Sequence, residues 1–209
     1  MKTENLYEYD VTVSSGNFRI AGVDEAGRGP LAGPVAAAAV ILDLNSPIDG
    51  INDSKKLNAK RRDELYDKIT ASGCVYGVGI VSPQEIDEIN ILQATFRAMR
   101  LALEKLEGLY DTVLVDGNQL IAGIDKNLQR TVVKGDGISA NIAAASIIAK
   151  VTRDRIMEEL HEQYPMYDFN GNKGYGTARH RAAIAEYGLS PVHRRSFCGN
   201  FAVQTDIFS

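Results

Sequence analysis

The sequence has no tryptophan, and it has few residues that bind metals through sulfur or nitrogen: two cysteines and three histidines among 209 residues. Cys74 and Cys198 are widely separated and match no metal-binding or redox spacing, so we expect free thiols in a reducing compartment. His161, His180 and His193 show no ligand spacing either. A zinc site is therefore not predicted, and we interpret the histidines as surface or core polar residues.

Long hydrophobic runs are also missing. The longest, residues 35–42 and 142–149, fall far short of the roughly 20 residues that a membrane-spanning helix needs. Residues 1–10 include three acids and lack the basic start and apolar centre of a secretory signal. The hydrophobic content of 44% is nevertheless sufficient for a full core. We expect a soluble, cytoplasmic protein with no membrane partner.

Positive charge is in deficit overall but is concentrated in one segment. The net charge of −4 argues against binding to nucleic acid through bulk electrostatics. Between residues 173 and 195, however, one acid accompanies five basic residues, which are Lys173, Arg179, Arg181, Arg194 and Arg195. Such a segment suits a polyanionic partner and is equally typical of a solvated helix face, so charge alone leaves both interpretations open.

The hydrophobic pattern predicts strands at residues 18–24, 35–43, 75–81, 112–116 and 130–133, and helices at residues 58–70, 91–107, 139–161 and 178–187. The first three strands should form a meander. Ser82, Pro83 and Glu85 carry the capping signals of a helix start just before the second long helical segment. Because the strand at 112–116 follows a long helix, we expect it to lie parallel to an earlier strand. Beside the first strand, it would bring Asp116 close to Asp24.

Asp24 and Glu25 stand between an apolar run and a loop of glycine, alanine and proline. Adjacent carboxylates at the end of a buried strand repel each other unless a cation, a shared proton or a basic partner offsets their charge. A metal site used in phosphate chemistry is therefore our first hypothesis. The alternative is a solvated turn, because aspartate and glycine are also turn formers. The buried-looking strands on both sides make the turn less attractive.

A fourth acid, Asp154, belongs to the helix expected at residues 139–161. Ser146, Lys150, Asp154 and Glu158 recur every four residues and so share one face of that helix. On this pattern alone, Asp154 is interpreted as the partner of an ordinary helical ion pair, which would contribute only a few tenths of a kcal/mol.

Seven blocks of the sequence resemble bacterial ribonuclease HII, and they occur in the order and at the spacing of that family: residues 22–29, 52–55, 114–117, 133–136, 144–155, 173–177 and 193–197. The resemblance extends from about residue 21 to residue 197. It implies an α/β protein with the ribonuclease-H-like fold, in which helices flank a five-stranded mixed sheet. It also implies one domain over residues 1–209, with a core at about 18–163 and a helical, substrate-binding C-terminal region at about 164–209.

By motif match, Asp24, Glu25, Asp116 and Asp154 correspond to the four acids that hold divalent metal in this family, and the resemblance therefore favours a catalytic role for Asp154 over the helical ion pair. The implied cofactors are Mg²⁺ or Mn²⁺, with two ions during catalysis. The implied reaction is endonucleolytic hydrolysis of the RNA strand of RNA/DNA hybrids. A second implied reaction is cleavage 5′ of single ribonucleotides in duplex DNA, as in ribonucleotide excision repair, leaving a 3′-hydroxyl and a 5′-phosphate.

The resemblance also assigns substrate-binding residues. Gly27, Arg28 and Gly29 match the loop whose backbone reaches the 2′-hydroxyl, and Tyr175 matches the tyrosine that packs on the sugar at the ribonucleotide-to-deoxyribonucleotide junction. Three lysines are expected to contact phosphates: Lys55, Lys134 and Lys173. A monomer is the simplest expectation, and residues 198–209 contain no clear clamp-binding motif, which leaves a replication-clamp partner open.

Two other functional classes compete with the nuclease. A nucleic-acid binding module could keep the fold without the reaction, but it would gain from losing negative charge near phosphate. A glycosidase could use paired carboxylates without metal, yet nothing else in the sequence points to carbohydrate. The enzyme interpretation is the one that we carry forward.

Overall fold

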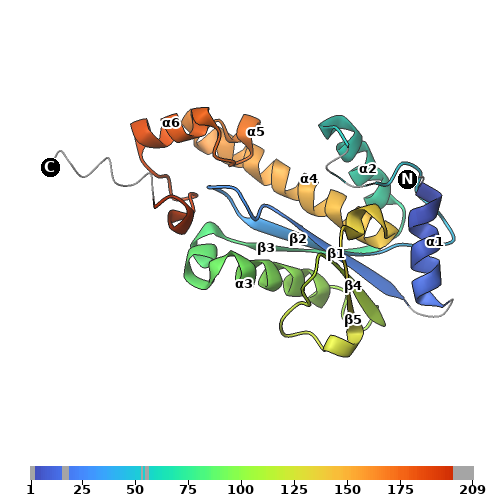
Figure 1. Ribbon diagram of the computed structural model, residues 1–209. Coiled ribbons are helices and arrows are strands. Elements are labelled where there is room, and N and C mark those ends of the chain that lie inside the picture. The colour runs from blue at the N-terminus through green and yellow to red at the C-terminus, as the bar shows by residue number, and fades with distance from the viewer. Residues whose placement is uncertain (1–2, 16–18, 53, 55–56, 200–209) are drawn as a thin grey trace.

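A mixed five-stranded sheet forms the centre of the molecule (Figure 1). The computed structural model describes residues 3–15, 19–52, 54 and 57–199. The strand order is β3-β2-β1-β4-β5, with β1 antiparallel to β2 and parallel to β4. The strands are β1 (Ile20–Ala26), β2 (Val35–Ile41), β3 (Val75–Val81), β4 (Thr112–Asp116) and β5 (Gln129–Val132). The expected meander is confirmed, and β4 is parallel to an earlier strand as expected; the structure identifies that strand as β1.

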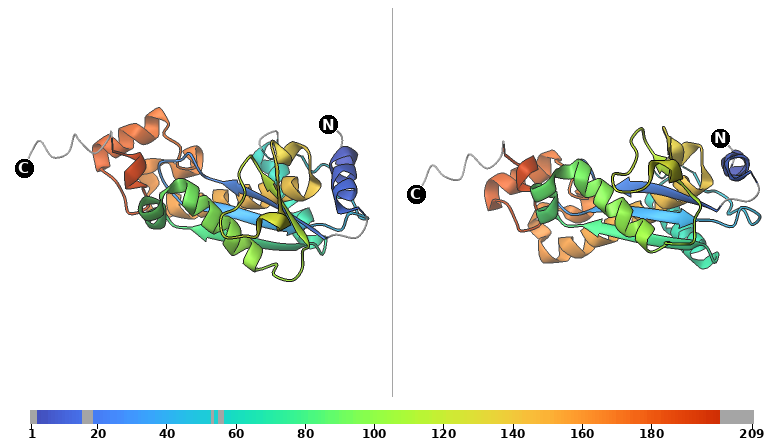
Figure 2. Two further views of the ribbon diagram at one scale, coloured as in Figure 1. Left: turned by 60° about the horizontal axis from the view of Figure 1, so that its bottom comes forward. Right: turned by 90° about the horizontal axis from the view of Figure 1, so that it is seen from below.

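Helices cover both faces of this sheet (Figure 2). One face packs against α4 (Ala140–Gln163) and α2 (Ala59–Ala71), and the other packs against α3 (Pro83–Glu104). In β2, Ala38 and Val40 belong to the first core, whereas Ala37 and Ala39 belong to the second. Alternate residues of a strand point to opposite faces, so a strand of small apolar side chains lets both layers of helices approach closely.

Helix α4 lies against β1 at Gly22. A Cβ atom at this position would lie only 2.2 Å from the carbonyl carbon of Asn141, at the start of the helix. The Asn141 side chain accepts a hydrogen bond from the Leu42 backbone (2.8 Å). Its own backbone and amide N–H groups donate to the Asp10 carboxylate, at 2.9 and 2.8 Å. The beginning of α4 is therefore fixed by three separate segments of the chain.

Asp10 belongs to α1 (Thr3–Ser14), a helix that the sequence pattern does not predict. Its apolar residues Leu6 and Tyr7 are buried against the α4 side of the core. Burial raises the pKa of the Asp10 carboxyl, and the hydrogen bonds from Asn141 and Ser139 oppose this rise. Tyr9 and Val13 of this helix also pack on the core. The buried Asp10 interrupts the apolar pattern that would mark the helix in the sequence.

The predicted start of α3 is confirmed, with a complication. Ser82 and Glu85 form a reciprocal capping box, and Pro83 occupies the first turn. Asn90 then interrupts the helix with φ 66°, and its side-chain oxygen accepts hydrogen bonds from the Leu92 and Gln93 backbones at 3.0 and 3.1 Å. Asn90 therefore serves as the N-cap of a second segment, which agrees with the predicted helix beginning at about residue 91.

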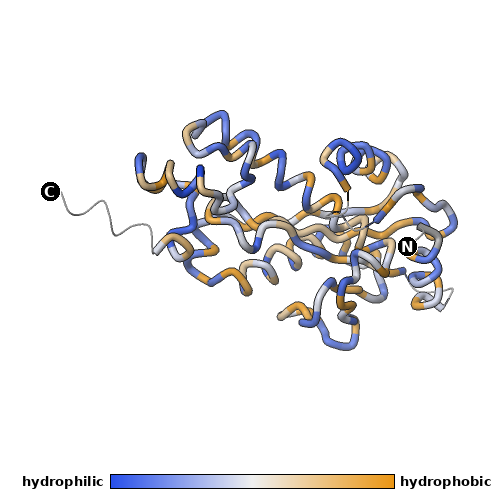
Figure 3. The backbone as a smooth tube through the Cα atoms, turned by 45° about the horizontal axis from the view of Figure 1, so that its top comes forward, coloured by the Kyte–Doolittle hydropathy of each residue, from blue (hydrophilic) through white to orange (hydrophobic). Residues whose placement is uncertain are grey.

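The C-terminal part folds back over the ends of β1 and β2 (Figure 1). It contains α5 (Phe169–Asn172) and the predicted α6 (Ala178–Tyr187), whose hydrophobic residues form a separate small core with Ala32 and Met157. Figure 3 shows hydrophobic residues along the central strands and hydrophilic ones on the outer helical turns. Within the described ranges, no helix combines the length and the apolar character needed to cross a membrane.

Candidate active site

Three of the predicted acids meet at one edge of the sheet. The parallel register pairs Val23 of β1 with Val115 of β4, so Asp24 and Asp116 each follow the last paired residue. Together with Glu25 they line one cavity of about 240 Å³. Asp24 is only 4% exposed, and its Oδ1 accepts the backbone N–H of Glu25 at 2.7 Å. The topology thus gathers these carboxylates as the strand order predicts.

The structure adds an acid that was not among the predicted site residues, Asp136. It lies in a 3₁₀ turn (Gly135–Gly137) just after β5 and is 5% exposed. The preceding Gly135 N–H donates to Asp116 Oδ1 at 2.6 Å, which holds this turn against β4. The sequence marks Asp136 only as the last residue of the block at 133–136; that β5 is parallel to β4, which brings an acid just after β5 to the same edge as Asp116, comes from the structure.

Burial and the neighbouring acids both disfavour the ionised form of Asp24. Its pKa is raised well above the usual range, first by burial and then by the charges of Glu25, Asp116 and Asp136, while the Glu25 N–H opposes the rise. Arg28 provides a counter-charge in the cavity lining, with its Nη1 3.5 Å from Glu25 Oε1. Its side chain is 52% exposed, so this contact is weak. The arrangement therefore favours a further cation near Asp24.

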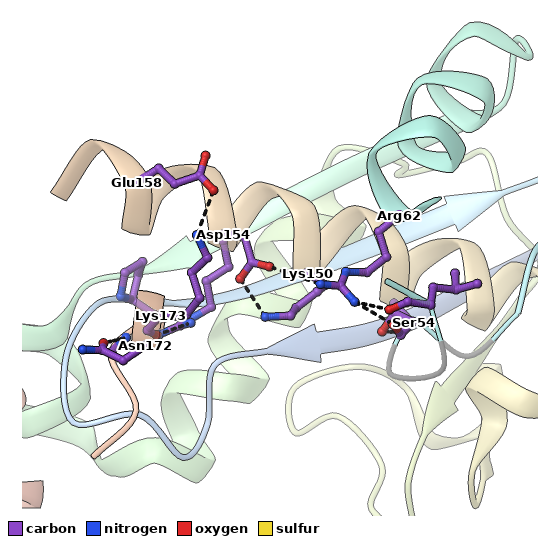
Figure 4. A network of polar contacts seen from close by, with 12 residues as sticks. Ser54, Arg62, Lys150, Asp154, Glu158, Asn172 and Lys173 are labelled. Carbon is purple, nitrogen blue, oxygen red and sulfur yellow. Dashed lines mark hydrogen bonds and ion pairs between the residues drawn. The ribbon is translucent and has the colours of Figure 1, made fainter. Parts of the chain in front are cut away.

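Asp154 lies elsewhere. Its Oδ1 accepts a hydrogen bond from Lys150 Nζ at 2.7 Å, and its Oδ2 lies 3.9 Å from a guanidinium nitrogen of Arg62 (Figure 4). These three residues line a second, adjacent cavity of about 640 Å³, and only Lys150 lines both cavities. The acids that chiefly raise the pKa of Asp24 are Glu25, Asp116 and Asp136, and Asp154 is not one of them. The metal-binding role of Asp154 stays a prediction, and the structure offers Asp136 as its competitor.

The loop at residues 27–34 borders the acids, and two buried arginines hydrogen-bond to its backbone. Arg153 and Arg194 are 1% and 0% exposed, and none of their hydrogen bonds among the described residues goes to a carboxylate. Their guanidinium groups instead donate to backbone carbonyls of residues 27, 28, 32, 33, 34 and 173, at 2.6–3.1 Å. Burial lowers the pKa of Arg194 to about 9 and that of Arg153 to about 10.

This clamp orients the predicted substrate loop. Arg194 donates hydrogen bonds to the carbonyls of Gly27 and Arg28. In a planar trans peptide the N–H points opposite to the C=O, so the N–H groups of Arg28 and Gly29 point away from the buried guanidinium. Gly27 has φ 99°, and a Cβ there would lie 2.0 Å from Arg153 Nε. Glycine is required at this position by both backbone conformation and space.

The remaining predicted residues take different positions. Tyr175 is 48% exposed, lines the acid cavity, and lies with its Cε1 3.7 Å from where a Cβ on Gly29 would be. Lys134 is exposed beside the Gly135–Gly137 turn, and Lys173 forms an ion pair with Glu158 at 2.7 Å (Figure 4). Lys55 lies outside the described residues. Tyr175 is thus part of the acid cavity, while Lys173 faces the second one.

The donor set suits a hard divalent cation. Carboxylate oxygens are the ligands that Mg²⁺ and Mn²⁺ prefer, and Asp24 and Asp116 each use one oxygen for a backbone N–H, which leaves the other for a ligand. As the side chains of the described residues stand, no three acids, histidines or cysteines converge closely enough to enclose a metal ion. The chemistry and the charge fit a cation, and binding would require side-chain rotation.

Comparison with known proteins identifies this arrangement. The family model of ribonuclease HII matches residues 21–200. The chain belongs to the ribonuclease HII family. It is 55% identical over 185 residues to ribonuclease HII of Acetivibrio thermocellus, which covers 88% of this chain and 71% of that relative. It is 57% identical over 181 residues to ribonuclease HII of Rickettsia bellii, covering 87% and 90%.

Solved structures agree with this ribonuclease HII assignment. Ribonuclease H2 of Pyrococcus horikoshii OT3 superposes with a TM-score of 0.70 at 28% identity, over 89% of this chain and 98% of that one. Ribonuclease HII of Archaeoglobus fulgidus, solved in complex with PCNA, gives 0.65 at 29% identity, over 84% and 93%. Bst-RNase HIII, solved with Mn²⁺, shares the fold with a TM-score of 0.72 at 18% identity, over 89% and 69%.

Membership of the ribonuclease HII family determines the general activity. The chain is an endonuclease of the ribonuclease H type, and it hydrolyses the RNA strand of RNA/DNA hybrids. The expected ribonuclease-H-like fold, a five-stranded mixed sheet flanked by helices, is confirmed. The cavity lined by Asp24, Glu25 and Asp116 is the candidate active site for this reaction.

Proposed function

We propose that this enzyme also cuts 5′ of single ribonucleotides embedded in duplex DNA, leaving a 3′-hydroxyl and a 5′-phosphate. The observation that carries the proposal is that Asp24, Glu25 and Asp116 share one cavity with residues 27–29 and the ring of Tyr175. Cutting at one ribonucleotide requires hydrolytic groups beside groups that distinguish ribose from deoxyribose. Both kinds of group lie in the same cavity here.

The cation ligands that we propose are Asp24, Glu25, Asp116 and Asp136, with Mg²⁺ or Mn²⁺ as the metal and two ions during catalysis. Bound ions of this kind supply a nucleophile at neutral pH and stabilise the charge of the leaving oxygen. The protein contributes placement. Asp24 accepts the Glu25 N–H and Asp116 accepts the Gly135 N–H, and these hydrogen bonds limit how far either carboxylate has to turn to meet a cation.

Asp154 then has a different role. Its carboxylate holds Lys150, the residue that lines both cavities, with a 2.7 Å hydrogen bond. Burial lowers the pKa of the Lys150 ammonium, and the hydrogen bond and charge of Asp154 counteract that effect. Asp154 therefore keeps Lys150 charged and in place, where it can contact a phosphate of the substrate.

Recognition of the ribonucleotide is assigned to the loop and the ring. The N–H groups of Arg28 and Gly29, directed away from the Arg194 clamp, are donors for the 2′-hydroxyl. The exposed ring of Tyr175 packs on the following sugar, where the absence of a 2′-oxygen leaves room for a flat ring. The proposed specificity thus combines a polar contact to one sugar with an apolar contact to the next.

The partners that we propose are nucleic acids: an RNA/DNA hybrid and a DNA duplex with an embedded ribonucleotide. Lysines at three positions are proposed to contact phosphates: Lys55, Lys134 and Lys173. The protein is expected to act as a monomer. The PCNA complex of the Archaeoglobus fulgidus relative makes a sliding clamp a partner worth testing, for example by co-elution with and without residues 198–209.

The central experiment is product mapping on an end-labelled DNA duplex with one ribonucleotide, beside an all-DNA duplex of the same sequence. We expect a cut 5′ of the ribonucleotide with Mg²⁺ or Mn²⁺, no cut with EDTA, and none in the control duplex. Folded enzyme that cleaves a continuous hybrid but leaves the single ribonucleotide intact would contradict the proposal.

The choice between Asp136 and Asp154 is tested with paired variants in that assay. Loss of a cation ligand removes several kcal/mol of transition-state stabilisation, so Asp136→Asn should lower the rate at least about a hundredfold, as Asp24→Asn should. Asp154→Asn should lower it by about tenfold or less, because it only releases Lys150. The opposite ranking would restore Asp154 as the fourth ligand and remove Asp136 from the site.

A further inference from the structure

Two buried histidines lie in direct contact beneath Tyr175, and neither touches the acid cavity. His180, in the first turn of α6, is 0% exposed, and His193, near the C-terminal end of the described chain, is 3% exposed. Their Nε2 atoms are 3.0 Å apart. Such a contact is a hydrogen bond only if one ring carries a proton on Nε2 and the other does not.

The neighbours of the pair determine where each proton lies. The backbone N–H of Ser190 can only donate, and it lies 3.0 Å from His193 Nδ1, which must therefore be an acceptor. Neutral His193 then carries its proton on Nε2 and donates to His180 Nε2. His180 in turn must carry its proton on Nδ1, which donates to the carbonyl of Tyr175 at 2.9 Å.

Aromatic rings hold both imidazoles in this orientation. The ring centroid of Tyr167 lies 4.7 Å from that of His193, and the ring of Phe169 meets His180 edge-on at 5.4 Å. The Tyr167 hydroxyl donates to the carbonyl of Gly188, which closes the cluster from the other side. Burial lowers the pKa of both histidines, so both are neutral near pH 7.

The same pair connects Tyr175 with the loop at residues 27–34. The backbone of His193 bridges to Ala32, and its neighbour Arg194 donates its N–H to the Leu31 carbonyl at 2.8 Å. Leu31 in turn donates its own N–H to the carbonyl of Gly174, also at 2.8 Å. The backbone of His193 is therefore joined to the loop, while its side chain reaches the Tyr175 carbonyl through His180.

We infer that the His180–His193 pair positions Tyr175 against residues 27–29 and thereby sets the enzyme's preference for a ribonucleotide-to-deoxyribonucleotide junction. Neither histidine contacts substrate, so both are positioning residues. The inference rests on the proposed function, because it concerns the sugar contact assigned to Tyr175. A continuous hybrid has no such junction at most cleavage positions, so its cleavage depends much less on the pair.

The test compares cleavage of a duplex containing one ribonucleotide with cleavage of a continuous RNA/DNA hybrid of the same sequence. His180→Leu removes the donor to Tyr175 and should lower the first rate at least about tenfold relative to the second, since small misplacements of contact groups carry such losses. His180→Asn keeps a donor near the Nδ1 position and should restore the ratio to within about threefold. Thermal unfolding of each variant controls for folding.

A double-variant cycle separates positioning of Tyr175 from a general effect on the fold. Tyr175→Ala should show the same substrate-selective loss as His180→Leu, and the combined variant should lose little more, because residues that act as one unit are not additive. Losses that multiply, or that are equal on both substrates, would overturn the inference. Wild-type enzyme that fails to cut at the single ribonucleotide would instead refute the proposed function.

The proton arrangement can be tested without any variant that risks misfolding. Long-range ¹H–¹⁵N correlation spectra of the ¹⁵N-histidine enzyme contain only three ring patterns, because the chain has three histidines. Near pH 7.5, we expect one ring protonated on Nδ1 (His180) and one protonated on Nε2 (His193). A His180 ring protonated on Nε2 would show that it does not donate to Tyr175, and the inference would fail.

Discussion

Acidification should destabilise this enzyme through His193, and the size of the effect follows from its surroundings. His193 is 3% exposed, and burial, together with the adjacent His180 ring, lowers its pKa from 6.5 to about 4. The titratable group in contact with it is His180. Burial also lowers the pKa of His180, and the charge of Asp168 opposes this change. A proton on either ring would place two N–H donors face to face.

The sign of the effect is fixed by linkage. The folded protein holds His193 neutral, whereas the unfolded chain binds a proton once the pH falls below about 6.5. The contribution of neutral His193 to the free energy of unfolding is therefore complete above pH 6.5 and is lost progressively as the pH falls from 6.5 to about 4. At 1.36 kcal/mol per pKa unit, the total is about 3 kcal/mol, a large share of a typical free energy of unfolding.

The assay is urea-induced unfolding at a series of pH values across this window, with EDTA present, for the wild type and for His193→Gln. The glutamine cannot titrate, so the difference between the two free energies of unfolding isolates the histidine from every other titrating group. That difference should decrease by about 3 kcal/mol as the pH falls from 6.5 to 4. Parallel pH profiles for the two proteins would refute the reasoning.

Two further substitutions test the packing around the site. Gly22→Ala places a methyl group 2.2 Å from the Asn141 carbonyl carbon, so urea unfolding should show a loss of about 1–3 kcal/mol; Gly199→Ala, with no neighbour within 4 Å, should show none. Arg194→Lys removes the guanidinium that donates to the carbonyls of residues 27, 28, 33 and 34. It should lower the free energy of unfolding by about 3 kcal/mol and reduce the cleavage rate. Arg195→Lys, at the exposed neighbouring position, should change neither.

Local sequence signals predicted most of the elements because each rests on interactions within a few residues. The capping box of Ser82 and Glu85 satisfies backbone groups within one turn, so its residues are visible in the sequence, and the structure contains it. The strands that carry Asp24 and Asp116 were predicted from hydrophobic runs, and the rule for connections through a helix predicted that the later strand is parallel to an earlier one. That this neighbour is β1 is known from the structure. Helix α1 was missed because the buried Asp10 interrupts its apolar pattern.

The candidate site was only partly predictable. Glu25 follows directly from Asp24, and Asp116 follows from strand order, whereas Asp136 depends on a turn after β5 that begins with the left-handed residue Lys134 and returns to β4. Asp154 matches a motif block, yet the direction of a long helix face depends on what packs against it. Arg62 and Lys150 occupy the space on that side, and the carboxylate turns to them.

By itself, the sequence determined the family, the order and type of nearly all elements, and the three acids at the ends of β1 and β4, because hydrophobic period, caps and motif spacing are properties of neighbouring residues. The tertiary structure was needed to show that Asp136 joins those acids, that Arg194 donates hydrogen bonds to backbone carbonyls of the loop at residues 27–34, and that His180 and His193 lie in hydrogen-bond contact. These contacts link residues from 13 to 167 positions apart. Their geometry exists only after the helices have packed on the sheet.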